Sequence, residues 1–464
     1  MPQWFSLQRI RISVVCVLFV CMAFGCAGVP ASNTPSDPIP LTVLFFNDLH
    51  GHLMPFEIKG DGGRKEEVGG IARMARLIGA IRAENSRKQI RTLVLVAGDI
   101  LQGTPMSTVF HGEPDILCLN AMGVDAVTVG NHEFDFGLEN FLKLKEQAVF
   151  PFLSANIVTR KSGQPLCQAA LAVPLGDGLT FTIIGVTTRE LMTTTQAENV
   201  IDLQVTDSVI AVKQVYEEAQ ANGPVLLLSH SRHQTDREIA EALPELSAII
   251  GGHDQILLSP YRTVGRVPVL QAFEKGRYLG RIDLRIDPRS KKATLIDHKY
   301  ISITADITPD PRISAIVAAY DERLGQQFKQ VIGQSQSFLD GEREHIRYQE
   351  TSLGNFITDI MLAHTGAGIA LINSGALRAS IKEGPVTVED VFKAMPYANE
   401  LVLVELSGAE IERALVWSVR GTREDEDGGF LHVSGITFTI HGRRVENIKM
   451  APGGQPLDAR RIYT

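Results

Sequence analysis

Residues 131–135 (NHEFD) place an amide, an imidazole and two carboxylates within five positions. They follow residues 126–129, a short β-branched apolar run that Gly130 closes, which is typical of a buried strand. So many polar groups at the end of a buried strand are costly unless something binds there. For this segment taken alone, a solvated loop with incidental charges is the alternative.

Four further apolar runs, at residues 41–46, 92–97, 225–229 and 248–252, also end at hard oxygen or imidazole ligands. In sheets flanked by helices, binding groups gather outside the carboxyl ends of the strands. The five strand ends therefore predict one shared crevice. The set expected to converge there is Asp48, His50, Asp99, Asn131, His230, His253 and Gln255.

Seven nitrogen and oxygen ligands without a thiolate are too many for one tetrahedral ion, but they suit two ions that share a carboxylate. Asp99 stands alone at its strand end behind a flexible glycine, and is the expected bridge. Two cations about 3.5–4 Å apart are the usual arrangement for in-line displacement at phosphorus. Imidazole with carboxylate suits Zn, Mn, Fe or Co, so the type of metal stays open.

The blocks NDLHGH, GDILQG, GNHEFD, LLLSH and GGHDQ occur in this order over residues 41–255. Together they resemble the calcineurin-type metallophosphatases, in the 5'-nucleotidase branch. The resemblance implies that one metal is held by Asp48, His50, Asp99 and Gln255, and the other by Asp99, Asn131, His230 and His253. His233 is the alternative to His230, which lies directly at its strand end. Asp254 departs from the small residue that the family more often shows, which predicts altered metal preference or altered hydrogen bonding around the ligands.

The resemblance also implies that His132 and Asp135 are a catalytic dyad. A helical turn after Asn131 would make residues three apart face each other. The carboxylate would then orient His132 and favour its charged form. The implied fold is α/β, a two-sheet sandwich flanked by helices with a second, smaller α/β substrate-binding domain. The strand pattern alone suggests a single parallel sheet.

A length of 464 residues predicts two domains. We expect a catalytic domain at 41–306, a linker at 307–331 with a helix from Ile313 to Val331, and a second domain at 332–464. In the second domain an apolar stripe over 353–361, capped by Thr351 or Ser352, and a capping box at 407–410 indicate packing only.

The N-terminus predicts export. Arg9 and Arg11 precede an apolar segment at 12–25, so residues 1–26 have the features of a signal peptide. Residues 23–26 resemble a bacterial lipobox with Cys26 as the lipidated residue, and ordinary cleavage after Ala31 is the alternative. The protein would be periplasmic, or held at the membrane only by that lipid, with 27–40 as a flexible tether. Its oligomeric state is not predicted.

Two cysteines, Cys118 and Cys167, lie beyond the signal peptide and Cys26. Their spacing does not establish a disulfide, and two buried free thiols are expected. The formal charge of -8 disfavours nucleic acid polymers, so a small phosphate ester is the expected partner.

The second domain contains NSGALR, MPYAN and GFLHVSG, which resemble the substrate domain of 5'-nucleotidases. The resemblance implies Arg347 and Arg378 on phosphate, Asn373 and Asn399 near the nucleoside, and Tyr397 stacked on the base. The planar fork of arginine suits phosphate, and an aromatic face suits any base. The family usually continues past Thr464 with a second stacking aromatic and an aspartate for the ribose. We therefore expect an incomplete domain with an open base pocket.

The predicted function is metal-dependent hydrolysis of nucleoside 5'-monophosphates to nucleoside and phosphate, by attack of a metal-bound hydroxide. His132 would stabilise the developing charge or protonate the leaving alkoxide. A 2',3'-cyclic-nucleotide phosphodiesterase or a UDP-sugar hydrolase is the alternative within this chemistry. A non-catalytic nucleotide-binding lipoprotein, or a product whose second domain fails to fold, are alternatives of other classes.

Overall fold

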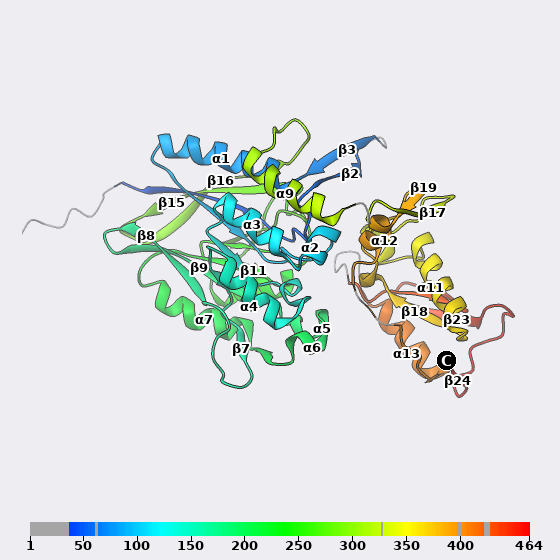
Figure 1. The fold of residues 1–464 in the computed structure, drawn as a ribbon. Helices are drawn as coiled ribbons and strands as arrows, with labels where there is room; N and C mark the ends of the chain where they lie inside the picture. The colour runs from blue at the N-terminus through cyan, green and yellow to red at the C-terminus, as the bar shows by residue number, and fades with distance from the viewer. Residues whose placement is uncertain (1–36, 61–63, 326–327, 398, 400, 422–426) are drawn as a thin grey trace, which may run out of the picture.

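The computed structural model describes residues 37–60, 64–325, 328–397, 399, 401–421 and 427–464. Two lobes are visible in Figure 1: one extends to helix α9 (Pro311–Leu324), and the other begins at strand β17 (Val331–Ser335). The predicted signal peptide, Cys26 and most of the tether lie outside the described residues. The tether is predicted to reach residue 40, but strand β1 begins at Ile39, so its last two positions belong to a sheet.

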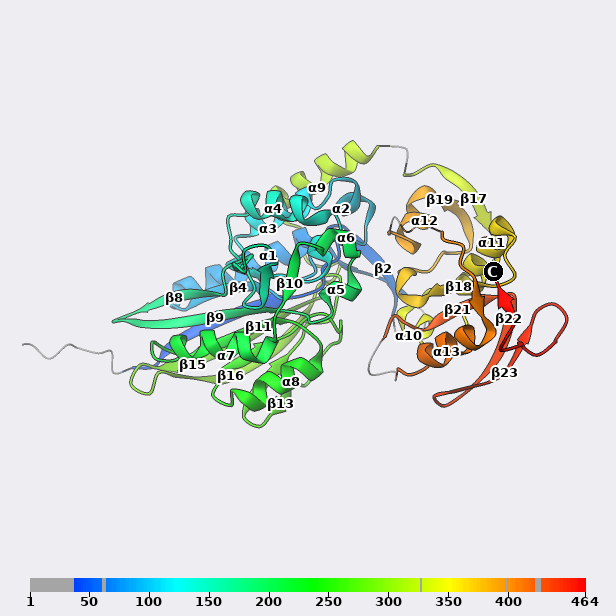
Figure 2. The same ribbon diagram turned by 90° about the horizontal axis from the view of Figure 1, so that it is seen from below.

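Two six-stranded sheets pack face to face in the first lobe, with helices on both outer sides (Figures 1 and 2). The first sheet has, in order, β16 (Lys292–Ser302), β15 (Tyr278–Asp287), β1 (Ile39–Phe46), β4 (Arg91–Val96), β5 (Ala126–Thr128) and β6 (Phe152–Leu153). The second has β13 (Arg262–Val264), β14 (Val267–Leu270), β12 (Ala248–Ile250), β11 (Val225–His230), β9 (Leu179–Thr187) and β8 (Ala170–Gly176).

Within each sheet the ligand-bearing strands are parallel to one another, but they are divided between the two sheets. Strands β1, β4 and β5 pair in parallel in one sheet, and β11 and β12 pair in parallel in the other. The two-sheet sandwich implied by the family resemblance is confirmed. The single sheet suggested by the strand pattern alone is wrong, because strand order does not follow from strand sequences.

Strand β1 shows how the layers form. Val43 and Phe45 pack between the two sheets, whereas Leu44 and Phe46 pack under the outer helices. Side chains alternate between the faces of a strand, so a continuous apolar run fits a strand that is covered on both sides.

The outer helices bury one face each. The predicted helix at 71 is α1 (Ile71–Arg87), with Ile71, Met74, Ile78 and Ile81 buried as expected. The other helices of this lobe are α2 (Pro105–Val109), α3 (Glu113–Met122), α4 (Gly137–Gln147), α5 (Leu191–Thr194), α6 (Ala197–Val200), α7 (Ser208–Ala219) and α8 (His233–Ala242). Short ladders join β2 (Pro55–Lys59) to β3 (Lys65–Gly69) and β7 (Ile157–Thr159) to β10 (Leu203–Val205).

The predicted linker helix is shorter than expected. Helix α9 ends at Leu324, and Val331, its predicted last residue, begins strand β17. Ile313, Val317 and Tyr320 are buried in the same cluster as α1 and α3, so α9 is packed against the first lobe.

The second lobe is built around two small apolar clusters and several two-stranded ladders (Figure 2). Its helices are α10 (Arg343–Ile346), α11 (Ser352–Thr365), α12 (Val388–Ala394) and α13 (Gly408–Ser418). Its remaining strands are β18 (Ala370–Asn373), β19 (Gly384–Thr387), β20 (Leu406–Ser407), β21 (Leu431–Ser434), β22 (Ile436–His441), β23 (Arg444–Met450) and β24 (Ile462–Tyr463).

The predicted helix starts in this lobe are confirmed, but one predicted packing face is not. Thr351 caps α11, and Ser407 forms a capping box with Glu410. Leu353 of the apolar stripe is buried, whereas Phe356 and Ile360 are 46% and 48% exposed. The stripe prediction is wrong at these two positions, because the pattern marks an apolar face but does not show whether anything covers it.

The two cysteines are buried and free, as predicted. Burial raises the pKa of the Cys167 thiol to about 12, which keeps it protonated and unreactive at neutral pH. Among the described residues, none of the helices has the length and apolar character needed to cross a membrane.

Candidate metal centre and catalytic cleft

Two clusters of ligand-type side chains share Asp99. One joins Asp99 with His50 and His132, and the other joins it with His230 and His253; within each cluster the ligand atoms lie within 4.8 Å of one another. Asp99 Oδ2 is 3.1 Å from His230 Nε2 and 3.9 Å from His50 Nε2. The carboxylate that the sequence predicts as a bridge thus lies between the two groups.

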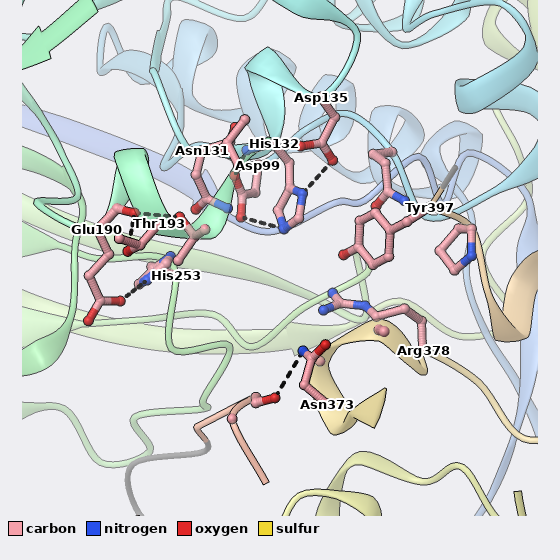
Figure 3. Close-up of a pocket in the computed structure, with 18 of the residues that line it drawn as sticks. Asp99, Asn131, His132, Asp135, Glu190, Thr193, His253, Asn373, Arg378 and Tyr397 are labelled. Carbon is pink, nitrogen blue, oxygen red and sulfur yellow. Dashed lines mark hydrogen bonds and ion pairs between the residues drawn. The ribbon is translucent and has the colours of Figure 1, made fainter. Parts of the chain in front are cut away.

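The other predicted ligands surround these clusters. Asp48 Oδ1 is 3.8 Å from His50 Nε2, and its Oδ2 accepts the backbone N–H of His253 at 3.0 Å. The side chain of Gln255 approaches His50 Nε2 to 2.8 Å. Asn131 lies next to Asp99 in Figure 3.

The loops that carry these residues are tied together by their backbones. The N–H of Asp48 donates to Gly98 O at 3.0 Å, and that of His50 donates to Asp99 O at 3.1 Å. Five predicted ligands have positive φ angles: Asp48 (49°), His50 (47°), Asp99 (51°), His253 (73°) and Gln255 (57°). Side chains other than glycine adopt this conformation at an energetic cost, and such strain is concentrated at functional sites.

Glu133 supports the floor of the site without being a predicted ligand. Its buried carboxylate accepts the N–H groups of Gly130 at 2.6 Å, Ile100 at 2.8 Å and Asp99 at 3.1 Å. Gly130 permits this close approach, because a Cβ there would lie 2.2 Å from Asp99 Oδ1. The Glu133 carboxylate of the NHEFD segment therefore holds two ligand loops together.

Several buried polar atoms of the site have no hydrogen-bond partner among the described residues: Asp48 Oδ1, His50 Nδ1 and Asn131 Oδ1. Buried polar atoms are normally satisfied. A nitrogen and oxygen donor set with unpaired atoms around a shared carboxylate fits divalent cations, so the residues present fit the metals that the sequence predicts.

The charges of the site support the same interpretation. Burial raises the pKa of Asp48 to about 7. Burial also acts to raise the pKa of Asp99, but His230 and His132 hold it well below its usual value. Burial acts to lower the pKa of His230, but the neighbouring Asp99 carboxylate raises it to about 10. A buried anionic centre that draws protons onto its neighbours is one that would also attract cations.

His132 and Asp135 form the predicted pair. A 3-10 turn, η2 (His132–Phe134), brings them together, and His132 Nδ1 lies 2.7 Å from Asp135 Oδ2. His132 Nε2 faces the metal cluster, 3.9 Å from Asp99 Oδ2 (Figure 3). Burial disfavours the charged imidazole, but Asp135, with Tyr397 and Asp99, raises the pKa of His132 well above its usual value.

A cleft of about 1320 Å³ opens over this floor, and the second lobe forms its opposite wall. Predicted residues from both lobes line it: Asp99, Asn131, His132, Asp135, His253, Gln255, Arg347, Asn373, Arg378, Tyr397 and Asn399. Asp48, His50 and His230 are buried below. The Tyr397 ring lies 6.1 Å from the His132 ring at 23°, and the Arg378 guanidinium lies 5.9 Å from the Tyr397 ring (Figure 3).

Sequence reasoning missed Arg343 and Glu190, cleft residues whose side chains contact predicted ligands. Arg343 Nη1 donates to Gln255 Oε1 at 2.6 Å and so links the second lobe to a predicted ligand; its position four residues before Arg347 was the available signal. Glu190 Oε2 lies 3.3 Å from His253 Nε2 and 2.8 Å from Arg232 Nε. The hydrogen bond from His253 is the main cause that lowers the pKa of Glu190 to about 2.

His233, the alternative to His230, is 42% exposed at its side chain and contacts Asp254 Oδ2 at 3.1 Å. His230 is fully buried beside Asp99, which favours it as the ligand. Asp254 also accepts the N–H of His233 at 2.6 Å, so its carboxylate orders the loop next to His253.

Comparison with known proteins agrees with this geometry. Residues 41–256 match the calcineurin-like phosphoesterase family, and residues 331–464 match the 5'-nucleotidase C-terminal domain. The crystal structure of a 5'-nucleotidase precursor from Thermus thermophilus is 30% identical, with a TM-score of 0.80, and the match covers 92% of this chain and 88% of that one. The chain belongs to the 5'-nucleotidase family.

Curated relatives match over most of the chain. The protein UshA of Yersinia enterocolitica is 27% identical over 473 residues, which cover 91% of this chain and 83% of UshA. The trifunctional nucleotide phosphoesterase protein YfkN of Bacillus subtilis is 31% identical over 469 residues, which cover 90% of this chain but 30% of YfkN. This 5'-nucleotidase family member is therefore a metal-dependent phosphoester hydrolase with the predicted fold.

Proposed function

We propose that the protein hydrolyses nucleoside 5'-monophosphates to nucleoside and phosphate, with two divalent metal ions bound. The observation that carries the proposal is the position of Asp99, shared by two ligand clusters beside the His132–Asp135 pair. Family membership and a cleft wall with arginine, asparagine and aromatic side chains support a nucleotide as the substrate.

The donor sets suggest how the ions would be held. Asp48, His50, Asp99 and Gln255 would hold one, and Asp99, Asn131, His230 and His253 the other. Divalent ions bound there would neutralise charge on the phosphate and lower the pKa of water. Imidazole and carboxylate ligands suit Zn, Mn, Fe and Co, so each of these metals fits the two proposed sites.

His132 is placed to handle the proton of the leaving group. Its Nδ1 is fixed by Asp135, which leaves Nε2 directed at the floor of the cleft. The raised pKa keeps a proton on the ring, so Nε2 can donate to the 5'-oxygen as its bond to phosphorus breaks.

The second lobe would bind the rest of the nucleotide. Arg378 and Arg347 offer planar guanidinium groups for the phosphate oxygens. Asn373 and Asn399 would contact the nucleoside, with Tyr397 as a stacking surface. Arg343 holds Gln255 from across the cleft, so binding at one wall can position a predicted ligand on the other.

Hydrolysis of a nucleotide sugar or of a cyclic nucleotide diester is the alternative activity for the same site. A cleft of about 1320 Å³ is larger than the roughly 300–1000 Å³ typical of small-ligand sites, which leaves room for a nucleotide sugar or a cyclic diester. A non-catalytic nucleotide-binding lipoprotein would need no His132–Asp135 pair.

We also propose export to the bacterial cell envelope on the basis of residues 1–26, with Cys26 as the site of lipidation.

Phosphate release from AMP, with added Mn²⁺ or Zn²⁺ and with or without chelator, tests the proposal. We expect metal-dependent release that exceeds release from 2',3'-cyclic AMP or UDP-glucose. Saturable AMP binding without phosphate release under any divalent metal would overturn hydrolysis in favour of the binding protein. Faster turnover of the cyclic diester or the nucleotide sugar would replace the substrate and leave the metal site unchanged.

A further inference from the structure

A second aromatic surface lines the cleft on the wall formed by α13. Trp417, in the last turn of this helix, is 64% exposed although indole is among the largest apolar side chains. Trp417 and Arg420 both line the cavity that contains the metal ligands. An exposed tryptophan that faces a binding cleft is a candidate contact for a ligand.

Arg420 is held in place against this tryptophan. Its guanidinium carbon lies 3.8 Å from the centre of the indole ring. Nη1 donates to Trp417 O at 2.8 Å, and Nη2 lies 2.5 Å from Asp427 Oδ2. These contacts fix the guanidinium without a ligand, so the pair needs little reordering when one binds.

A glycine loop connects this pair to the predicted nucleotide residues. Gly428 O accepts the Asn373 side-chain N–H at 3.2 Å. A Cβ at Gly428 would lie 3.1 Å from Arg347 Nη1, and one at Gly429 would lie 3.3 Å from Arg420 Nη1. Arg347 therefore lies close to the backbone of Gly428, and Arg420 lies close to the backbone of the next residue, Gly429.

Tyr397 occupies a different part of the cleft. Its ring is nearly parallel to His132, 6.1 Å away, beside the groups that would act on the phosphate. Trp417 and Arg420 line the same cleft, and Asp427, which pairs with Arg420, directly precedes the Gly428 carbonyl that accepts from Asn373.

We propose that Trp417 and Arg420 form a stacking subsite for a nucleobase. The inference rests on the proposed function and adds a base-recognition site to it. Stacking on an aromatic or guanidinium face tolerates any base, so the subsite would supply affinity more than base selection. The ring could come from the hydrolysed nucleotide or from the second nucleoside of a dinucleotide, since both present the same face.

Fluorescence of Trp417 tests the contact directly. The chain has two tryptophans, Trp4 and Trp417, so a Trp4→Phe version of the full chain reports on Trp417 alone. With excitation at the red edge of the tryptophan band, we expect saturable quenching by adenosine and none by ribose 5-phosphate. Quenching by diadenosine diphosphate but not by adenosine assigns the subsite to a second base. Absence of quenching by both adenine compounds overturns the proposal.

Kinetics supply the second readout. Trp417→Ala should raise KM for AMP, or for the dinucleotide if only that quenches, by about 5- to 150-fold, the range of base–aromatic stacking. Its kcat, and its KM for ribose 5-phosphate, should not change. Trp417→Phe should restore most of the affinity. Val416→Ala, an exposed position on the same helix outside the cleft lining, is the matched control.

The two proposals fail in different ways. A wild-type protein that hydrolyses AMP, with a Trp417→Ala variant of unchanged KM for every base-containing substrate, overturns the subsite and leaves the function. A protein that releases phosphate from no ester, while adenosine still quenches Trp417, overturns the function and leaves the subsite.

Discussion

Asp99 is the residue on which both ligand clusters depend. Asp99→Ala removes the only carboxylate that the clusters share, and it also removes the acceptor for the His132 N–H at 2.9 Å. We expect bound metal to fall below one ion per chain and turnover to fall by more than about 100-fold, since even outer partners of a metal site cost roughly 10- to 100-fold. Elemental analysis and phosphate release measure the two effects.

His111→Ala is the control for this variant. His111 lines the same cleft, but its ring stacks on Phe136 at 5.0 Å and belongs to neither cluster. It should keep its metal. Full metal content in Asp99→Ala would contradict the shared-ligand assignment.

The buried carboxyl group of Asp115 lowers the stability of the folded protein by an amount that depends on pH. Its side chain is fully buried. Burial raises its pKa from 3.8 to about 8, although the nearby Ser107 acts in the opposite direction, so the folded state keeps a proton that the unfolded state loses. The stability that this bound proton contributes to the folded state is fully present below about pH 4 and is lost as the pH rises through about 8.

We therefore expect Asp115→Asn to be more stable than wild type at pH 8, by on the order of a few kcal/mol, and equally stable at pH 4. Thermal unfolding at several pH values measures this difference. An equal shift at every pH would show that the residue acts through packing and not through its proton.

The predictable part of the site consists of residues at strand ends. All seven predicted ligands and the His132–Asp135 pair were predicted from their position after apolar runs, together with the family resemblance, and the structure brings them together. Glu190 and Arg343 were not predicted. Glu190 lies three residues beyond the end of β9, and Arg343 crosses from the other lobe, so neither stands directly at the end of an apolar run.

At the scale of elements, glycines determine how closely the ligand loops approach. Gly130→Ala would place a methyl group 2.2 Å from Asp99 Oδ1 and 2.6 Å from the Asp99 backbone nitrogen. We expect this substitution to displace Asp99 and to lower both metal content and turnover. Metal binding and phosphate release are the measurements.

Gly79→Ala is the matched control. Gly79 lies within α1, and a Cβ there meets no atom within 4 Å. Alanine favours a helix over glycine by about 0.5–1 kcal/mol, so this variant should be more stable and equally active. If both glycine variants kept full activity, close packing at Gly130 would not matter for the site.

Helix starts that depend on neighbouring residues were predictable from the sequence. Helix ends and burial that depend on packing against distant segments were not. The start of α11 at its Thr351 cap and the capping box of α13 follow from neighbouring residues. The end of α9 and the exposure of Phe356 depend on which distant segments pack nearby, and a periodic pattern does not contain that information. The division of the ligand strands between two sheets has the same origin.

At the scale of the whole molecule, every predicted metal ligand lies in the first lobe, between residues 48 and 255, while the cleft is completed by the second. Metal should therefore stabilise one lobe selectively. We expect Mn²⁺ or Zn²⁺ at about 100 times its dissociation constant to stabilise the first lobe by about 2.7 kcal/mol and to leave the second unchanged.

Differential scanning calorimetry with metal and with chelator measures this selectivity as a shift in one of two transitions. Addition of AMP without metal serves as the comparison, because its predicted contacts are mainly on the second lobe. An equal shift of both transitions on metal addition would show that the lobes unfold together and would contradict the prediction.

The left-handed backbone at Asp48, His50, Asp99, His253 and Gln255 also bears on how the protein can be engineered. At each of these positions glycine would relax the chain, so a search for heat-resistant variants guided by folding energy alone would select glycine there. Such a search would produce a sturdier protein with no catalytic centre. Any programme of stabilisation must hold these five positions fixed and look for improvement elsewhere.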